Sequence, residues 1–378
     1  MRIVYLHHAN VCRGGIERMF AQKATILADQ MGWEVVMLTY EQNGEPFPYP
    51  LSSRIKQVNL DVRLYAAYQV SYPLRYFKKI MLRRQLSAAI RRFLQTWKPD
   101  IVICTDKDTH EMDALFKAHT TERLIVEAHI GMIDHEFQVL STKNFLKRLI
   151  ARKNVWRLKQ SVSHFDMLVA LTTDDARCWQ PYVQTVVIPN SLPYFPPHAA
   201  DLSEIRHRVI AVGRLDRQKG FDLLLDAWQM VQQKHPDWQL DIFGDGMERD
   251  ALMAQCSALN LTTVTLHPST ADIYAEYMKS DFLVCSSRWE SFGVVLIEAM
   301  ACGIPVVSFN CDNGPRNIIT EGENGLLVAD GDTRQLAEKI CWMMEHHDRC
   351  QQMGIQARSH VDRYRVEHLL PQYLELYK

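Results

Sequence analysis

Short apolar segments rich in β-branched residues alternate along this chain with longer segments in which apolar residues recur at helical spacing. In the first half, the short segments are 3–7, 35–39, 57–60, 101–104, 124–128, 167–171 and 186–188. In the second half, they are 208–212, 239–243, 263–266, 282–285, 305–309 and 326–328. This alternation predicts βαβ units, whose parallel strands are buried on both faces of a sheet.

The pattern restarts near Arg208, after the proline-rich segment PNSLPYFPP at 189–197. Prolines favour extended backbone, so this segment is expected to link two domains. We therefore predict an α/β protein with two Rossmann-like, doubly wound domains that face each other across a cleft. The predicted domains are 1–195 and 196–360, and a C-terminal helix at 361–378 is expected to pack back on the first. In such sheets, ligands bind outside the carboxyl ends of the strands.

Composition supports this picture and narrows the class of protein. The 378 residues fit two domains, and 47% hydrophobic with 23% charged residues is typical of a globular chain. The net charge of -1 gives no indication of a nucleic-acid partner. Nine dispersed cysteines without a CxxC pair indicate reduced thiols in a cytoplasmic protein. The chain opens directly on a strand and contains no run of 18 apolar residues, so neither a signal peptide nor a transmembrane helix is expected.

The segment GRLDRQKGFD at 213–222 follows a predicted strand and precedes a helical pattern. Gly213 lets a ligand approach the backbone closely. Arg214 and Lys219 place two cations at the carboxyl end of the strand, beside a helix N-terminus that itself favours anions. The arrangement suits a diphosphate. A solvated loop with two ordinary surface cations is the alternative.

The segment ESFGVVLIEAMACGIPVV at 290–307 predicts a polar loop and then a helix that begins near Phe292. Glu290 would lie in the loop, and Glu298 about 12 Å further along the helix, so the two carboxylates would grip different parts of one extended ligand. Carboxylates accept hydrogen bonds from the vicinal hydroxyls of a sugar or a ribose. Alternatively, Glu290 is a helix N-terminal charge and Glu298 a buried salt-bridge partner. The apolar neighbours of Glu298 require that it has a specific partner.

These two segments together resemble the retaining glycosyltransferases with two Rossmann-like domains (the GT-B fold), and family 4 in particular. The matches include KG at 219–220, FGDG at 243–246, the two glutamates with EAMACGIPV at 298–306, and EGENGLLV at 321–328. The resemblance covers nearly all of 205–345, whereas the N-terminal half matches more loosely. The CxxGPR form of 311–316 resembles bacterial members that build capsule, lipopolysaccharide or lipid-linked oligosaccharide with galactose-type donors.

The resemblance implies a role for each matching residue. Arg214 and Lys219 would neutralise the donor diphosphate, Glu298 would bind the ribose hydroxyls, and Glu290 would contact the transferred sugar. The other implied donor-binding positions are Gly14, Gly15, Gly213, Gly244, Ser291, Phe292 and Gly293. The amides of the last three would face a phosphate. The implied catalytic residues are His129, Glu290, Lys219 and Arg214.

The N-terminal domain offers weaker candidates. The loop RGGIE at 13–17 joins the first strand to the first helix and departs from GxGxxG, so a dinucleotide site is not supported. The resemblance places this loop over the donor phosphates, although a tight turn is the alternative. His129 follows a strand and would face the sugar, unless it is structural. Asp106 and Asp108 after another strand, and Asn190 at the interdomain turn, are candidate acceptor contacts.

Two N-terminal segments, 75–93 and 145–157, are basic and amphipathic. Such helices can lie on anionic lipid with their aromatic side chains inserted. A solvated, charged helix face is the alternative. A membrane contact would place the protein at the inner face of the cytoplasmic membrane and would suit an acceptor anchored to a lipid carrier.

The predicted function is that of a retaining hexosyltransferase. It would move a hexose or N-acetylhexosamine from a nucleotide sugar, with UDP as the expected nucleotide, to a glycan or polyprenyl-lipid-linked acceptor in bacterial surface polysaccharide synthesis. We expect no metal ion and no cofactor, because the cations can replace a metal and the triplet DKD at 106–108, which has DxD spacing, lies in the acceptor domain. Two alternatives stay open: an epimerase or hydrolase on the same fold, and a non-catalytic module that binds sugar nucleotides.

Overall fold

The computed structural model describes residues 1–9, 11, 15–71, 73–132, 135–136, 139 and 144–378. The chain divides into two compact units. Unit 1 comprises Met1–Ile188 together with Glu375–Lys378, and unit 2 comprises Pro189–Leu374. The division therefore falls at the first residue of the proline-rich segment 189–197.

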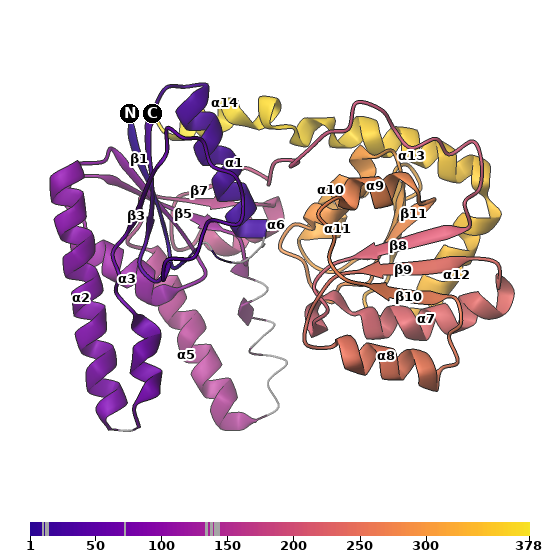
Figure 1. Ribbon diagram of the computed structural model, residues 1–378, viewed down its shortest axis with the longest axis horizontal. Helices are drawn as coiled ribbons and strands as arrows, with labels where there is room; N and C mark the ends of the chain where they lie inside the picture. The colour runs from indigo at the N-terminus through magenta and orange to yellow at the C-terminus, as the bar shows by residue number, and fades with distance from the viewer. Residues whose placement is uncertain (10, 12–14, 72, 133–134, 137–138, 140–143) are drawn as a thin grey trace. The chain divides into compact units, whose positions relative to one another are not determined.

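Unit 1 is built around a seven-stranded parallel sheet with the order β3-β2-β1-β4-β5-β6-β7. Figure 1 labels β1, β3, β5 and β7 of this sheet. Its strands are β1 (Arg2–His7), β2 (Glu34–Thr39), β3 (Lys56–Asn59), β4 (Ile101–Thr105), β5 (Arg123–Ala128), β6 (Met167–Ala170) and β7 (Thr185–Val187). Its helices are α1 (Gly15–Asp29), η1 (Leu64–Gln69), α2 (Leu74–Trp97), α3 (Thr109–Ala118), α5 (Phe145–Val162) and α6 (Thr173–Trp179).

Helices cover both faces of the unit 1 sheet. Val4 and Leu6 of β1 belong to the apolar core that contains Leu86 of α2. Tyr5 lies between them in the strand and meets Phe20 of α1, with 5.0 Å between the ring centroids. Because successive strand residues point to opposite faces, α1 and α2 lie on opposite sides of the sheet.

Unit 2 has a six-stranded parallel sheet with the order β10-β9-β8-β11-β12-β13. Its strands are β8 (Arg208–Val212), β9 (Gln239–Phe243), β10 (Val264–His267), β11 (Phe282–Cys285), β12 (Val306–Phe309) and β13 (Gly325–Val328). Its helices include η2 (Arg217–Lys219), α7 (Phe221–Lys234), α8 (Arg249–Ala258), α9 (Ile273–Met278), α10 (Val294–Ala301), α11 (Gly314–Ile318) and α12 (Thr333–Glu345). Each segment expected to be a strand is a strand, and the prediction of two Rossmann-like α/β domains is confirmed.

Both sheets have a point at which the strand order reverses. In unit 1 it lies between β1 and β4, and in unit 2 between β8 and β11. Loops that leave neighbouring strands in opposite directions leave a crevice at such a point, which is where doubly wound sheets bind ligands. In unit 2, the two loops at this point are those that carry Arg214, Lys219 and Glu290.

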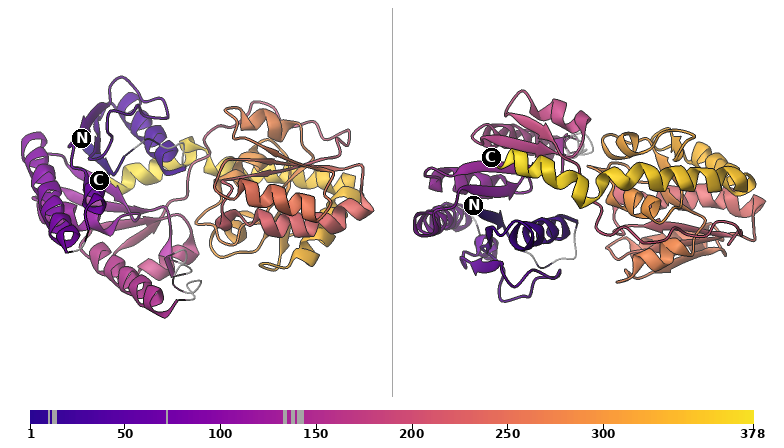
Figure 2. Two further views of the ribbon diagram at one scale, coloured as in Figure 1. Left: turned by 60° about the horizontal axis from the view of Figure 1, so that its bottom comes forward. Right: turned by 90° about the horizontal axis from the view of Figure 1, so that it is seen from above.

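The C-terminal helices α13 (His347–Val361), η3 (Asp362–Tyr364) and α14 (Val366–Leu376) end the chain. Its last residues belong to unit 1: the hydroxyls of Tyr377 and Tyr5 are 3.4 Å apart, and Arg123 donates to the carbonyl oxygen of Leu376 at 2.5 Å. The two chain ends accordingly lie near each other in every view (Figures 1 and 2). Within the described residues, no helix combines the length and the apolar character needed to cross a membrane.

Candidate active site

Lys219 and Glu290 meet at the point where the strand order of unit 2 reverses. Lys219 ends η2 in the loop after β8, and Glu290 lies in the loop after β11. The Lys219 Nζ is 2.5 Å from Glu290 Oε1, and the two side chains are only 14% and 7% exposed. Ser287 Oγ donates to the same carboxylate oxygen at 2.6 Å. Two residues that are 71 positions apart in sequence therefore form one buried ion pair.

This pairing joins the residue expected to contact the diphosphate to the residue expected to contact the sugar. Burial opposes the charge on Lys219, but the Glu290 carboxylate outweighs it and raises the pKa of the lysine. Lys219 is therefore protonated at neutral pH, and its charge is already compensated within the site. An anion that binds Lys219 must therefore compete with the Glu290 carboxylate for the lysine ammonium group.

Arg214 is the accessible cation of this site. Its side chain is 71% exposed, with Asp216 at 3.2 Å, and it donates to Gln218 at 2.9 Å. An ion pair at such an exposed position contributes about 0–1 kcal/mol to stability. The guanidinium is therefore free to exchange these partners for a phosphate.

Two glycines bring the loops after β8 and β9 together. A Cβ on Gly244 would lie 1.8 Å from the carbonyl oxygen of Gly213, so no side chain fits there. A Cβ on Gly213 would lie 3.0 Å from the Cγ and Cδ of Lys219, whose stem covers this glycine. Packing within unit 2 therefore requires glycine at 244 whether or not a nucleotide base lies beside it.

The loop after Glu290 differs from the prediction. Helix α10 begins at Val294, so the expected start near Phe292 was wrong. Gly293 precedes the helix with φ +90, a backbone conformation that side chains disfavour, and this stops the helix from extending backwards. The amides of Ser291 and its two successors thus belong to the loop. Glu290 lies in the loop, as expected, and Glu298 lies within the helix.

The side chain of Phe292 is directed into the core of unit 2. It is buried, and its ring centroid lies 5.4 Å from that of Tyr364 in an edge contact. Only the backbone of Phe292 is therefore placed to face a ligand. Anchoring of this ring positions the loop that carries Glu290.

Glu298 has the specific partner that its apolar setting requires. It lies in α10 with 5% of its surface exposed, and the Tyr277 hydroxyl donates to its Oε2 at 3.4 Å. Burial, reinforced by the Glu298 charge, raises the pKa of Tyr277, so the phenol remains a donor. The expected helical position of Glu298 is confirmed.

His129 belongs to a buried charged cluster in unit 1. Its Nε2 lies 3.0 Å from Glu127 Oε2, and Glu127 also forms an ion pair with Lys23. Burial opposes the charge on Glu127, but Lys23 and His129 outweigh it and lower its pKa to about 2. An ionised carboxylate only accepts, so His129 Nε2 carries the proton. The side chain is 3% exposed, which leaves little of it to face a sugar.

Sequence reasoning missed Glu127 and Lys23. Glu127 is the only charged residue in the apolar run LIVEA of β5, and an isolated charge in a buried strand indicates a paired group. The sequence therefore indicated that Glu127 is paired. The sequence did not indicate that Lys23 is the partner, because this lysine lies 104 positions away on α1.

The ion pair of Lys23 and Glu127 predicts a specific acid sensitivity. The pKa of Glu127 falls from 4.5 to about 2 on folding, so its stabilisation is present above pH 4.5 and is lost as the pH falls towards 2. We expect the free energy of unfolding to drop by about 3 kcal/mol over this interval, at 1.36 kcal/mol per pKa unit. Urea unfolding at several pH values measures the drop. The double variant Lys23→Met/Glu127→Gln should lack this component; an unchanged pH profile in that variant contradicts the assignment.

Asp106 and Asp108 have structural contacts. The carboxylate of Asp106 is fully buried and accepts the backbone amides of His129, Ile130 and Gly131 at 2.9, 3.1 and 3.1 Å. Asp108 caps α3 by accepting the His110 amide at 2.7 Å. The Asp106 carboxylate is thus covered by the loop 129–131 and has no exposed surface that could contact an acceptor. The expected acceptor contact of Asp106 was therefore wrong.

The remaining candidates are less constrained. Gly14 lies outside the described residues. Gly15 is the first residue of α1, and a Cβ built there meets no atom within 4 Å, so the space beside it is open. Asn190 is 8% exposed and belongs to unit 2. Their predicted roles stay predictions.

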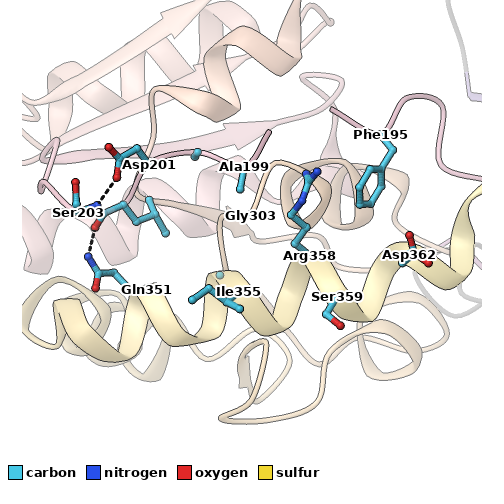
Figure 3. Close-up of a pocket in the computed structure, with 13 residues that line it drawn as sticks. Phe195, Ala199, Asp201, Ser203, Gly303, Gln351, Ile355, Arg358, Ser359 and Asp362 are labelled. Carbon is cyan, nitrogen blue, oxygen red and sulfur yellow. Dashed lines mark hydrogen bonds between the residues drawn. The ribbon is translucent and has the colours of Figure 1, made fainter. Parts of the chain in front are cut away.

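One cavity of unit 2 is lined by none of the predicted site residues. It has a volume of about 790 Å³ and lies between the segment 195–203 and α13 (Figure 3). Arg358 donates to the carbonyl oxygens of Ala301 and, at 2.6 Å, Pro196, and its guanidinium covers the ring of Phe195. These contacts hold the linker segment on α13, so the arginine has a structural function. Among the described residues, no three His, Cys, Asp or Glu side chains are grouped as a metal site.

Comparison with known proteins identifies similar sequences. Residues 200–360 match the family described as glycosyl transferases group 1. An uncharacterized glycosyltransferase of Haemophilus influenzae is 28% identical over 95% of both chains. The amylovoran biosynthesis glycosyltransferase AmsD of Erwinia amylovora is 25% identical over 82% of this chain and 80% of its own length.

Solved structures share the fold. Sucrose-phosphate synthase from Thermosynechococcus elongatus superposes with a TM-score of 0.80 at 22% identity, over 100% of this chain and 98% of its own. Anabaena Alr3699/HepE, solved in complex with UDP and glucose, superposes with a TM-score of 0.75 at 19% identity, over 100% and 99% of the two chains. At these identities the likeness shows the architecture, namely two Rossmann-like domains with parallel sheets.

Proposed function

We propose that this transferase, whose residues 200–360 match the family described as glycosyl transferases group 1, moves a hexose or N-acetylhexosamine from a nucleotide sugar with retention of configuration. The observation that carries the proposal is the buried pair of Lys219 and Glu290 beside the exposed Arg214, at the point where the strand order of unit 2 reverses. UDP is the proposed nucleotide, and the UDP complex of the similar Anabaena protein supports this choice.

The donor diphosphate would be held by the two cations. When a phosphate oxygen takes the place of Glu290 at Lys219 Nζ, the carboxylate is released to accept a hydroxyl of the transferred sugar. The solvent-exposed side chain of Arg214 then adds a second positive charge. Charged donors that are already in place stabilise the negative charge that develops on the leaving diphosphate, because no solvent needs to reorganise. We propose that these cations make a metal ion unnecessary.

The reaction itself is a single exchange of bonds at the anomeric carbon. The bond from this carbon to the diphosphate oxygen breaks, and the bond to the acceptor oxygen forms on the same face of the sugar. The departing phosphate oxygen takes the acceptor proton. Glu290 would hold the sugar during the exchange, and Glu298 would bind the ribose hydroxyls of the nucleotide.

We propose that the acceptor is a glycan or a lipid-linked sugar of a bacterial surface polysaccharide. The similarity to the amylovoran biosynthesis enzyme AmsD supports this class. Helices α2 and α5 also expose large apolar side chains among their cations, namely Leu74, Tyr76, Phe77, Met81, Phe145, Leu146, Leu149, Ile150 and Trp156. Exposed apolar groups with neighbouring cations suit contact with an anionic membrane surface, where a lipid-linked acceptor would lie.

Arg214→Ala is expected to separate catalysis from stability. The side chain is largely exposed, so its loss should change the free energy of unfolding by less than about 1 kcal/mol. Loss of one charged donor to the leaving group should lower kcat/KM by about 100-fold. Steady-state kinetics and thermal unfolding of the same preparation measure both effects. Full activity in this variant would contradict a diphosphate contact.

The proposed activity can be tested without knowing the sugar. Nucleotide sugars are screened by thermal shift, and those that stabilise the protein are incubated with membrane extracts and a radiolabelled donor. Transfer of label to glycan or lipid is the expected result. Incubation with donor alone is the control: release of free sugar or an epimer at the same rate without acceptor would favour the hydrolase or epimerase alternative.

A further inference from the structure

A second basic site lies in unit 1, where α2, α3 and α5 meet. These helices line an open cavity of about 560 Å³. Its lining includes five permanent cations and one carboxylate: Arg83, Arg84, Arg91, Lys117, Arg157 and Asp113. All of them belong to unit 1, whereas the proposed donor site belongs to unit 2.

The single carboxylate of the lining is already engaged. Asp113 forms an ion pair with Arg157 and accepts the Ser161 hydroxyl at 2.6 Å. Burial opposes its ionisation, but these two partners outweigh it and lower the pKa of Asp113. One ionised carboxylate compensates one arginine. The other cations of the cavity therefore keep an excess of positive charge.

Arg83 is held by a partner that carries no charge. Its Nη2 lies 2.5 Å from Nε2 of His110. Burial, together with repulsion from Arg83 and Arg157, lowers the pKa of His110 to about 4 despite the attraction of Asp108. The imidazole is thus neutral at pH 7 and accepts from the guanidinium. It fixes the position of Arg83 without compensating its charge.

The arrangement differs from an ordinary solvated helix face. Burial and repulsion from Arg157 also lower the pKa of Arg83, although Asp108 and Asp113 partly oppose this shift. Both arginines line the same cavity. Within the described part of the chain, Arg84 forms no hydrogen bond or ion pair. Arg91, in contrast, donates to the carbonyl oxygen of Lys117 near the end of α3 and has a structural function. Like charges converge on a cavity only at an electrostatic cost that an anion would remove.

We propose that this cavity binds a phosphate-bearing group, with Arg83, Arg84 and Arg157 as its main contacts. The guanidinium fork matches two oxygens of a phosphate, which makes arginine the preferred residue for this recognition. The cavity is larger than a bare phosphate requires, so it can admit the group that carries it. That group is either the headgroup of an anionic phospholipid or a soluble phosphate ester. The proposal does not depend on sugar transfer.

The test compares Arg84→Gln with Arg92→Gln. Both arginines are exposed on α2 and both changes remove one charge, but Arg92 does not line the cavity. Two probes distinguish a soluble phosphate ester from a lipid headgroup. Binding of glycerol 1-phosphate is measured by calorimetry, and binding to phosphatidylcholine vesicles with or without phosphatidylglycerol is measured by flotation. We expect Arg84→Gln to weaken binding about 10-fold, by loss of one charge-assisted bond. Arg92→Gln should bind as the wild type does.

Each outcome decides the proposal. Binding of the soluble ester that weakens in Arg84→Gln supports a phosphate metabolite, and the same selective weakening only with phosphatidylglycerol vesicles supports a lipid headgroup. No binding of either probe overturns the proposal, as does equal weakening in both variants. If binding of a probe is lost in Arg214→Ala but kept in Arg84→Gln, the phosphate binds at the donor site. This result would also overturn the proposal.

Discussion

Lys219→Ala is expected to lower kcat by about 1,000-fold, the upper end of the range for removing one preorganised group that stabilises developing negative charge. The lysine is the buried cation of the proposed donor site, and its Nζ is 2.5 Å from the carboxylate that would contact the sugar. Its loss removes a phosphate contact and also leaves Glu290 without its partner. Steady-state kinetics with a saturating donor measure the effect on kcat.

The same substitution affects stability, which must be separated from catalysis. An ion left unpaired in a buried site costs about 3–5 kcal/mol, so Lys219→Ala is expected to unfold at a temperature about 10 °C lower. The double variant Lys219→Met/Glu290→Gln removes both charges and keeps the approximate volumes. It should recover most of the unfolding temperature, because a neutral pair of similar size can replace a buried ion pair.

The double variant is therefore the decisive control. A stable protein that still lacks transfer assigns the loss of activity to the chemistry of the pair. If the double variant regained full transfer, Lys219 would be a structural residue, and the proposed diphosphate contact would be abandoned.

Glu298→Gln is expected to give the second large effect, this time on donor binding. An ionised carboxylate that accepts two vicinal hydroxyls makes two charge-assisted hydrogen bonds, each contributing about 1.5–3 kcal/mol. Replacing it with a neutral amide should therefore raise KM for the donor by about 100-fold. Because Glu298 is proposed to act on the ribose and not on the reacting carbon, kcat should fall much less.

A modified donor makes this prediction specific. The wild-type enzyme should discriminate against a 2′-deoxyribose donor, and Glu298→Gln should lose most of that discrimination. Tyr277→Phe is the matched control, because it removes the hydroxyl that donates to Glu298 while the carboxylate remains. It should retain the discrimination. Equal discrimination in Glu298→Gln and the wild type would show that the carboxylate does not bind the ribose.

Much of the fold was predictable because strands and helices each produce a characteristic local pattern of apolar residues. A strand buried on both faces is an unbroken apolar run, and α7 buries Phe221, Leu224, Leu225, Trp228 and Val231 at helical spacing. The donor site was predicted for a related reason, together with the family resemblance. Arg214, Lys219 and Glu290 lie in the segments that follow strands, and parallel strands carry their ligands at one edge of the sheet.

Other features could not be derived from local sequence. The start of α10 depends on Gly293 adopting φ +90, a conformation open to glycine but not dictated by it. Asp106 resembled a free strand-end carboxylate until the structure showed three backbone amides of the neighbouring loop around it. For Asp106, the deciding atoms lie 23 to 25 positions away in the sequence.

By itself, the sequence determined the alternation of strands and helices, the two domains, and the strand ends at which charged residues gather. Only the tertiary structure decided which of these residues are partners. It joined Lys219 to Glu290, Glu127 to Lys23, and Arg83 to His110. The physical reason is that periodicity and composition act over a few residues. The partner of a buried charge depends instead on which strands and helices are neighbours in the fold, and the sequence order does not state this.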